Sequence, residues 1–216
     1  MKKLTLTVTV LLISLMSITL VACGRTVLTS DEGRYTIITR GRWDGNVYIN
    51  EYLGLRFNLP NEWISASDDD IAMLAGISLD ISGLDQELPD DFWEIAGISM
   101  LWDMWAMDMT TGSNVQIIYE ALPYPQSMMS ELEFVETILA QVKQAPIDIS
   151  ANIVHGTTVI GNYAWYSYAS VVDMHGNQEH MRHFINIKND IARHIIIVYL
   201  PDISPLEVTL GLLGDI

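Results

Sequence analysis

The chain has 216 residues, one cysteine and a net charge of −16 at pH 7. One cysteine excludes a disulfide within the chain, and so acidic a protein repels phosphate backbones, so we expect no nucleic-acid partner. Half of the residues are hydrophobic, so the folded part can bury an ordinary core without a disulfide or a cysteine-based metal site.

The first 22 residues predict a secretory signal peptide. Lys2 and Lys3 precede an uncharged stretch, residues 4–21, that is rich in Leu, Val, Ile and Thr. The stretch leads into Leu20-Val21-Ala22-Cys23, which resembles the lipobox of bacterial lipoproteins. Two alternatives stay open: an uncleaved membrane-spanning helix, since about 18 apolar residues nearly cross a bilayer, and an ordinary secreted protein in which Cys23 has no role.

The lipobox resemblance implies a location. In that family the cysteine thiol receives diacylglycerol and a peptidase cuts before it, so the mature chain would begin at lipidated Cys23, extracytoplasmic and anchored to the cell membrane. Several acyl chains anchor a protein stably, because each buried CH₂ contributes about 0.8 kcal/mol. No other cofactor is expected. Residues 23–42 predict a short linker, and residues 43–216 predict one globular domain with 25 acidic and five basic residues.

Two patterns predict the first folded elements. Residues 35–60 alternate between apolar and polar side chains and are interrupted by glycines, which indicates an early pair of strands. Ser67 followed by Asp70 is typical of a helix start, because a capping serine and an acid in the first turn satisfy free N–H groups. Gly76 would end that helix.

The middle of the chain predicts a hairpin and an amphipathic helix. Within residues 98–122, two apolar stretches flank residues 110–114, which favour turn geometry. Ser130 and Glu133 then have the spacing of a capping box, and apolar residues recur on one face of a helix over 130–144.

After Pro146 the sequence predicts mostly strands, with Gly156 as a turn between the first two. The expected β-rich runs are 147–154, 157–160, 163–172, 179–187 and 191–199. Only short turns separate these runs, so neighbouring strands must be antiparallel. Residues 205–213 predict a last helix. Because strands and helices come in blocks, we expect an α+β fold with a mostly antiparallel β-sheet flanked by helices.

Short motifs in this domain resemble known families. Phe57-Asn58-Leu59-Pro60, with Trp63 three residues after the proline, resembles the opening of PsbP/Mog1-like domains and of uncharacterised Gram-positive lipoproteins. Residues 110–120 and the last amphipathic segment are similar to later parts of the second group. The resemblance spans about residues 43–213 and implies an α/β/α sandwich. It brings no catalytic residues with it.

Four candidate metal ligands, His175, Glu179, His180 and His183, lie within nine positions. Imidazole and carboxylate are natural ligands for zinc and similar metals. Their spacing differs from H-E-x-x-H and from its inverted form. If 179–187 is a strand, His180 and His183 point to opposite faces. We therefore expect surface histidines and keep a metal site as the alternative.

A methionine-rich stretch offers soft thioether ligands for Cu(I). It contains Met100, Met104, Met107 and Met109 beside Trp102 and Trp105. Strand alternation predicts that Met100 shares one face with Met104, and Met107 shares one with Met109, so the four do not converge and core packing is expected. The acidic residues between 68 and 91 lack the spacing of a calcium-binding loop.

Catalytic motifs are missing from the sequence: it contains neither Gly-x-Ser-x-Gly nor a phosphate-binding loop, so we expect no catalytic residues. The first hypothesis is a non-catalytic, membrane-anchored domain that binds an envelope protein, a wall component or a small ligand. The second is a metal-handling lipoprotein that uses the hairpin histidines or the methionines. The third is a hydrolase with two carboxylates about 5–10 Å apart.

Overall fold

The computed structural model describes residues 38–67, 70–71, 100–122, 125–144, 149–174, 177–202 and 205–216. Most of the elements in these ranges are strands. The strands are β1 (Arg42–Asp44), β2 (Val47–Asn50), β3 (Leu55–Asn58), β4 (Trp63–Ser65), β5 (Met100–Asp108), β6 (Asn114–Ala121), β7 (Ile149–Ile160), β8 (Tyr163–Met174), β9 (Asn177–Lys188), β10 (Ile191–Tyr199) and β11 (Leu213–Asp215). The helices are η1 (Gln126–Met128), α4 (Glu131–Val142) and α5 (Leu206–Leu210).

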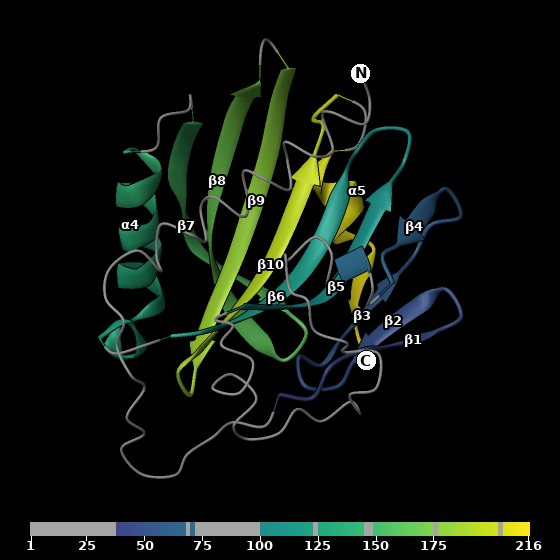
Figure 1. Cartoon of the computed structure of the whole chain (residues 1–216), viewed down its shortest axis with the longest axis horizontal. Coiled ribbons are helices and arrows are strands. Elements are labelled where there is room, and N and C mark those ends of the chain that lie inside the picture. Colours follow the sequence, from purple (N-terminus) through teal and green to yellow (C-terminus); the bar gives the residue numbers. More distant parts are fainter. Residues whose placement is uncertain are drawn as a thin grey trace.

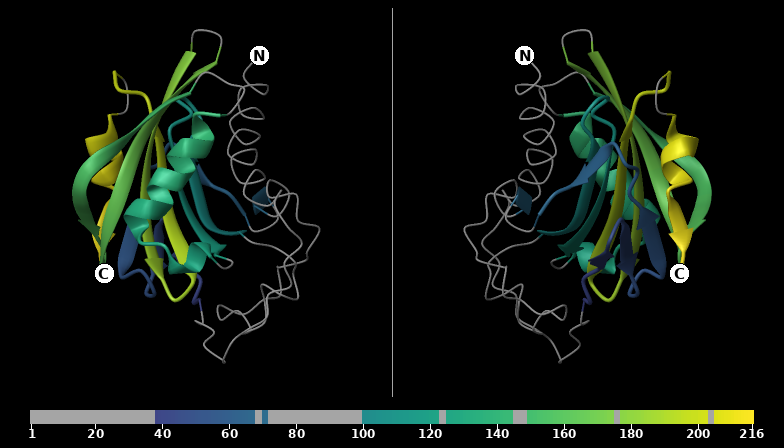
Figure 2. Two further views of the ribbon diagram at one scale, coloured as in Figure 1. Left: turned by 90° about the vertical axis from the view of Figure 1, so that its left-hand side faces the viewer. Right: turned by 90° about the vertical axis from the view of Figure 1, so that its right-hand side faces the viewer.

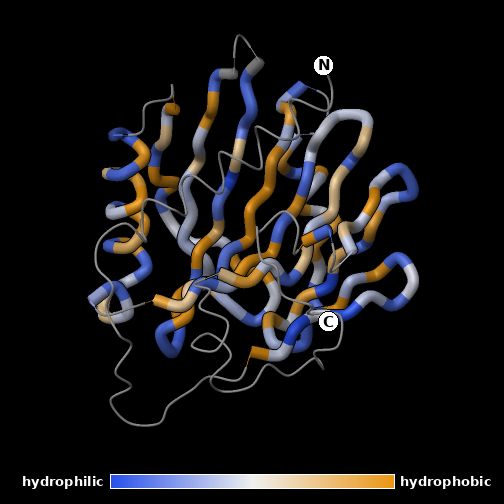
Figure 3. Tube along the Cα trace, in the orientation of Figure 1, coloured by the Kyte–Doolittle hydropathy of each residue, from blue (hydrophilic) through white to orange (hydrophobic). Residues whose placement is uncertain are grey.

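Seven antiparallel strands form the main sheet, in the order β4-β5-β6-β10-β9-β8-β7 (Figure 1). Neighbours in this order are mostly consecutive in the chain, while β6 and β10 pair across about 70 residues, with Ile191 opposite Ala121 and Val198 opposite Asn114. Residues 114–120 and 191–198 are all buried, which shows that both faces of the sheet are covered at its centre. Figure 3 shows hydrophobic residues along β10.

A second, four-stranded antiparallel sheet has the order β1-β2-β3-β11 and packs against the main sheet. Tyr48 and Phe57 of the small sheet share one buried cluster with Ile117 and Ile195 of the main sheet. Figure 2 shows α4 and α5 on opposite sides of the main sheet. Strand pairing therefore confirms the predicted mostly antiparallel architecture.

The strand register divides the main sheet into two faces. We call the face toward the small sheet the inner face; Tyr119 and Arg193 lie opposite each other on it. We call the face toward α4 the helix face; Glu120 and Ala192 lie opposite each other there. Each face has its own core, and the core of the helix face contains Phe134, Val135 and Leu139 of α4.

Helix α4 has the start and the amphipathic pattern that were predicted. The Ser130 Oγ accepts a hydrogen bond from the Glu133 N–H at 3.3 Å, and the Glu133 carboxylate accepts one from the Ser130 N–H at 2.9 Å. This capping box satisfies two N–H groups that the first turn leaves free. The apolar side of α4 faces the main sheet (Figure 3).

Most of the testable predictions for the first half of the domain agree with the structure. Residues 35–60 contain three strands, β1 to β3, rather than the expected pair, and β5 and β6 form the predicted hairpin. Ser67 and Asp70 exchange hydrogen bonds of 3.2 and 3.0 Å as expected of a helix start. The expected end of that helix at Gly76 lies outside the described residues.

Two elements near the end of the chain differ from the predictions. Residues 149–160 form one strand rather than two, because Gly156, with φ of +92°, lies at a β-bulge between Val154 and Thr157 and not in a turn. The last helix ends at Leu210, and residues 213–215 form β11 against β3. A strand of three residues is too short to show a period, so its sequence does not reveal it.

The described layers are α4, the main sheet, and the small sheet together with α5. The expected α/β/α sandwich stays a prediction, because the layer opposite α4 consists mainly of strands in the part of the chain that is described. Within that part, no helix has the length and apolar character needed to cross a membrane.

Candidate functional site

The predicted metal ligands do not converge in the described chain. On β9, His180 lies opposite Tyr199 and His183 lies opposite Ile196, so their side chains point to opposite faces of the sheet, as predicted. Glu179 shares the face of His183, and His175 lies outside the described residues. Among the described side chains, no group of three or more His, Cys, Asp or Glu could hold a metal ion.

His183 is buried, so the expectation of a surface histidine was wrong for this residue. Its ring stacks on Tyr168 with centroids 4.4 Å apart, and its Nε2 has no hydrogen-bond partner in the described chain. Burial, with the nearby charge of His194, lowers the pKa of His183 to about 3. His194 lies on the same face with its Nε2 3.2 Å from a Glu120 carboxylate oxygen. These histidines are part of the core.

The methionines occupy different positions from those predicted. Met100 lies on the helix face and Met104 on the inner face, because a β-bulge between Trp102 and Met104 inserts one residue into β5. Met107 returns to the helix face, while Met109 leaves the strand and is exposed. Met104 and Met107 are buried, so the prediction of core packing is confirmed for these two.

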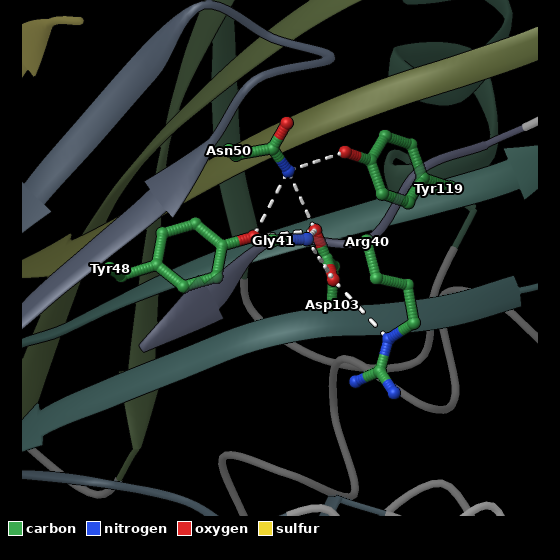
Figure 4. A network of polar contacts seen from close by, with 6 residues as sticks. All are labelled: Arg40, Gly41, Tyr48, Asn50, Asp103 and Tyr119. Atoms are coloured by element: carbon green, nitrogen blue, oxygen red, sulfur yellow. Dashed lines mark hydrogen bonds and ion pairs between the residues drawn. The ribbon is translucent and has the colours of Figure 1, made fainter. Parts of the chain in front are cut away.

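The same bulge turns Asp103 into the space between the two sheets, where it is buried. Its carboxylate accepts hydrogen bonds from the Tyr48 hydroxyl at 2.5 Å and the Asn50 amide at 2.8 Å. The Gly41 N–H donates to it at 3.2 Å, and the Arg40 Nε lies at 3.4 Å (Figure 4). We call these five residues the Asp103 clasp.

Asn50 connects the clasp to the rest of the core. Its amide nitrogen lies 2.9 Å from the Tyr119 hydroxyl (Figure 4). Its Oδ1 accepts a hydrogen bond from the Leu53 N–H at 2.8 Å. Asn50 belongs to β2, Asp103 to β5 and Tyr119 to β6, so the polar contacts join the small sheet to the main sheet.

Burial sets the protonation of the clasp. It raises the pKa of Asp103, while the Tyr48 hydroxyl, the Arg40 guanidinium and the Gly41 N–H each act to lower it. Burial and the Asp103 charge raise the pKa of Tyr48 well above its ordinary value. The hydroxyl therefore stays protonated and donates a hydrogen bond to the Asp103 carboxylate. The carboxylate oxygens are occupied by donors from the chain itself, which makes the clasp a joint between segments.

The clasp holds the N-terminal end of the described chain. Ile38 is only 1% exposed and belongs to the core between the sheets. Arg40 and Gly41 bind Asp103 directly. The core therefore includes residues that the sequence analysis assigned to the linker 23–42. Cys23, the expected lipid attachment site, lies outside the described residues.

Sequence reasoning missed the clasp, although one signal pointed to it. Asp103 is the single charged residue between Glu94 and Asp108, in the middle of an apolar strand. A lone carboxylate at such a position needs hydrogen-bond partners if it is buried. Its partners come from residues 53 to 63 positions earlier, and no local pattern identifies them.

No family model matches this chain, and no curated protein matches it. Among solved structures, the chain is similar to the solution structure of the cyanobacterial PsbP protein CyanoP from Synechocystis sp. PCC 6803. The TM-score is 0.42 and the sequence identity is 13%, over 90% of this chain and 99% of that chain. A similarity of this size carries no argument about the site or the function of this chain.

Proposed function

We propose that this protein is a lipoprotein, anchored outside the cytoplasm through diacylglycerol on Cys23, whose domain binds an envelope protein or a small ligand without catalysing a reaction. The observation that carries the proposal is Leu20-Val21-Ala22-Cys23 at the end of an uncharged apolar stretch that follows Lys2 and Lys3. These parts occur together and in the order that lipid attachment requires.

The position of the clasp supports a tethered domain. Ile38 is fixed in the core, so the segment from Cys23 to Ile38 can extend at most about 50 Å, at about 3.3–3.6 Å per residue. A domain that is pulled through its N-terminal segment needs a firm joint there, and the bonds from Arg40 and Gly41 to Asp103 provide one.

The charge of the domain supports a location beside the membrane rather than on it. Residues 43–216 carry 25 acidic and five basic residues, so an anionic lipid surface repels them. We include the PsbP/Mog1-like α/β/α layering in the proposal; an experimental structure of the whole mature chain tests it.

Lipid attachment is tested by expressing the full-length protein in a bacterium that processes lipoproteins. We expect labelled palmitate to be incorporated, the protein to sediment with membranes, and mass spectrometry to find a mature N-terminus at modified Cys23. Cys23→Ser should abolish the labelling, whereas the matched control Thr26→Ser should keep it. An unmodified thiol, or a chain that still begins at Met1, would contradict the proposal.

A further inference from the structure

A buried arginine without a carboxylate partner lies on the inner face. Arg193 of β10 is 0% exposed. Within the described chain, the arginines in ion pairs with carboxylates are Arg40, with Asp103, and Arg42, with Glu51; Arg193 has no such pair. This is unexpected in a domain whose acidic residues outnumber its basic residues 25 to five. A buried cation is strongly unfavourable unless an anion or hydrogen bonds compensate it.

Among the described residues, the groups that contact the guanidinium are neutral. Its Cζ lies 4.6 Å from the ring centroid of Tyr52 and 4.4 Å from that of Tyr163. Nη2 donates to the Tyr52 hydroxyl at 2.7 Å, and Nη1 donates to the Asn186 Oδ1 at 3.2 Å. The aromatic rings and two hydrogen bonds stabilise the cation but leave its charge without a counter-ion.

One N–H donor of the Arg193 guanidinium, at Nε, is buried and has no acceptor among the described residues. Nε and Nη2 lie on the same edge of the guanidinium, and together they form a two-donor fork that fits the two oxygens of a carboxylate or phosphate. In Arg193 this fork holds one neutral hydroxyl, from Tyr52, where an anion would use both donors.

A second cation lies on the same face of the sheet as Arg193. Lys188 is exposed, and its Nζ lies 5.7 Å from the Tyr163 ring centroid. Asn186 pairs with Arg193 across β9 and β10, so Lys188, two residues further on, is a diagonal neighbour of Arg193 on the same face. Tyr52, in the turn between β2 and β3, is half-buried and packs against the core of the inner face.

We propose that Arg193, Lys188 and Tyr52 form a binding site for a small anion that bears a carboxylate or phosphate group. The anion takes the place of the Tyr52 hydroxyl, bonds to Nε and Nη2 of Arg193, and meets Lys188 at its outer side. This names a ligand class for the binding function proposed above and rests on that function, but it does not depend on lipidation of Cys23.

The test uses the full chain purified in detergent and titrated separately with inorganic phosphate and with acetate. Binding is measured by calorimetry, and the Arg193 Nε–H signal is followed by NMR. We expect a saturable response, and the tighter of the two anions identifies the ligand group. Tyr52→Phe keeps the ring and removes the competing hydroxyl, so we expect it to tighten binding about three- to tenfold.

Other variants separate a specific site from a general effect of charge. We expect Lys188→Ala to weaken binding about threefold to tenfold and Arg193→Lys to abolish it, because an ammonium has no two-donor fork. Lys143→Ala, at an exposed lysine after α4, is the matched control and should leave binding unchanged.

Three results would overturn the proposal. The Nε–H signal could stay unmoved at saturating anion, or Tyr52→Phe could leave the affinity unchanged or lower it. A response that Arg193→Lys or Lys188→Ala does not alter would show an adventitious ion only. If Arg193→Lys fails to fold, Tyr52→Phe and Lys188→Ala still decide. If the anion titration fails while Cys23 proves to be lipidated, the proposed anion site is wrong and the lipoprotein proposal stands.

Discussion

Asp103 is the residue on which the joint between the two sheets depends. Asp103→Asn keeps the size of the side chain but places an amide NH₂ among the Asn50 and Gly41 donors. We expect the free energy of unfolding to fall by about 2–4 kcal/mol, since a buried, hydrogen-bonded charge is disrupted. Urea unfolding at pH 7 measures this loss. Glu62→Gln, at an exposed acid, is the control and should change stability by less than about 0.5 kcal/mol; equal effects would contradict the role of the clasp.

His183 makes stability depend on pH. Its pKa is about 3 in the folded chain and 6.5 ordinarily, so between these values the unfolded chain binds more protons. The contribution of neutral His183 to the free energy of unfolding is therefore fully present above pH 6.5. It falls by about 1.4 kcal/mol per pH unit as the pH decreases from 6.5 toward 3. His183→Phe retains an aromatic ring against Tyr168 and cannot titrate.

Urea unfolding at pH 7 and pH 5 distinguishes the two proteins. From pH 7 to pH 5 we expect the natural protein to lose about 2 kcal/mol more than His183→Phe, because only the natural protein takes up this proton on unfolding. The paired measurement subtracts the contribution of the other titrating groups. Parallel losses in both proteins would show that His183 is not held neutral.

At the scale of elements, two turns dock against each other. The Asn162 N–H, in the turn between β7 and β8, donates to the Leu53 carbonyl at 3.0 Å, in the turn between β2 and β3. Gly161 has φ of +58°, and a Cβ added there would lie 2.4 Å from the Leu53 oxygen. We expect Gly161→Ala to cost about 3 kcal/mol or more, through left-handed strain and through this clash.

Gly45 offers a matched control for that substitution. Its φ is +59°, but an added Cβ has nothing within 4 Å. Gly45→Ala should therefore cost only the strain, about 1–2 kcal/mol. The difference between the two variants in urea unfolding measures the docking of the turns. Equal losses would show that the turns do not constrain each other.

Elements with a clear period could be predicted from the sequence, and elements without one could not. α4 combines a capping box with apolar residues on one side, and both signals agree with the structure. The strand at 149–160 was divided in the prediction, because Gly156 in a bulge has the same local signature as Gly in a turn. The short strand β11 depends on its partner β3 and has no signal of its own.

The site was less predictable than the fold, because its contacts join distant residues. The opposite faces of His180 and His183 followed from alternation alone. The burial of His183 did not, since it requires the packing of the sheet as a whole. A single inserted residue in β5 placed Met100 and Met104 on opposite faces, where one shared face was predicted, and aimed Asp103 inward. Arg193 meets Tyr52 from 141 positions away, and no sequence spacing indicates this.

At the scale of the whole molecule, the core includes residues of the segment expected to be a linker. Ile38 lies in the same core cluster as residues from both sheets, and Arg40 and Gly41 close the clasp on Asp103. In the proposed lipoprotein, a pull on the N-terminal segment would reach both sheets through these contacts, whereas a segment that was attached only at β1 would act on an edge strand of the small sheet.

This arrangement predicts where the chain can be cut. A chain that begins at residue 43 lacks Ile38 and the two donors to Asp103, so we expect it to be about 3–5 kcal/mol less stable than one that begins at residue 36, which keeps these groups. Urea unfolding of the two chains measures the difference. Equal stability of the chains that begin at residues 36 and 43 would show that residues 38–41 lie on the domain without holding it together.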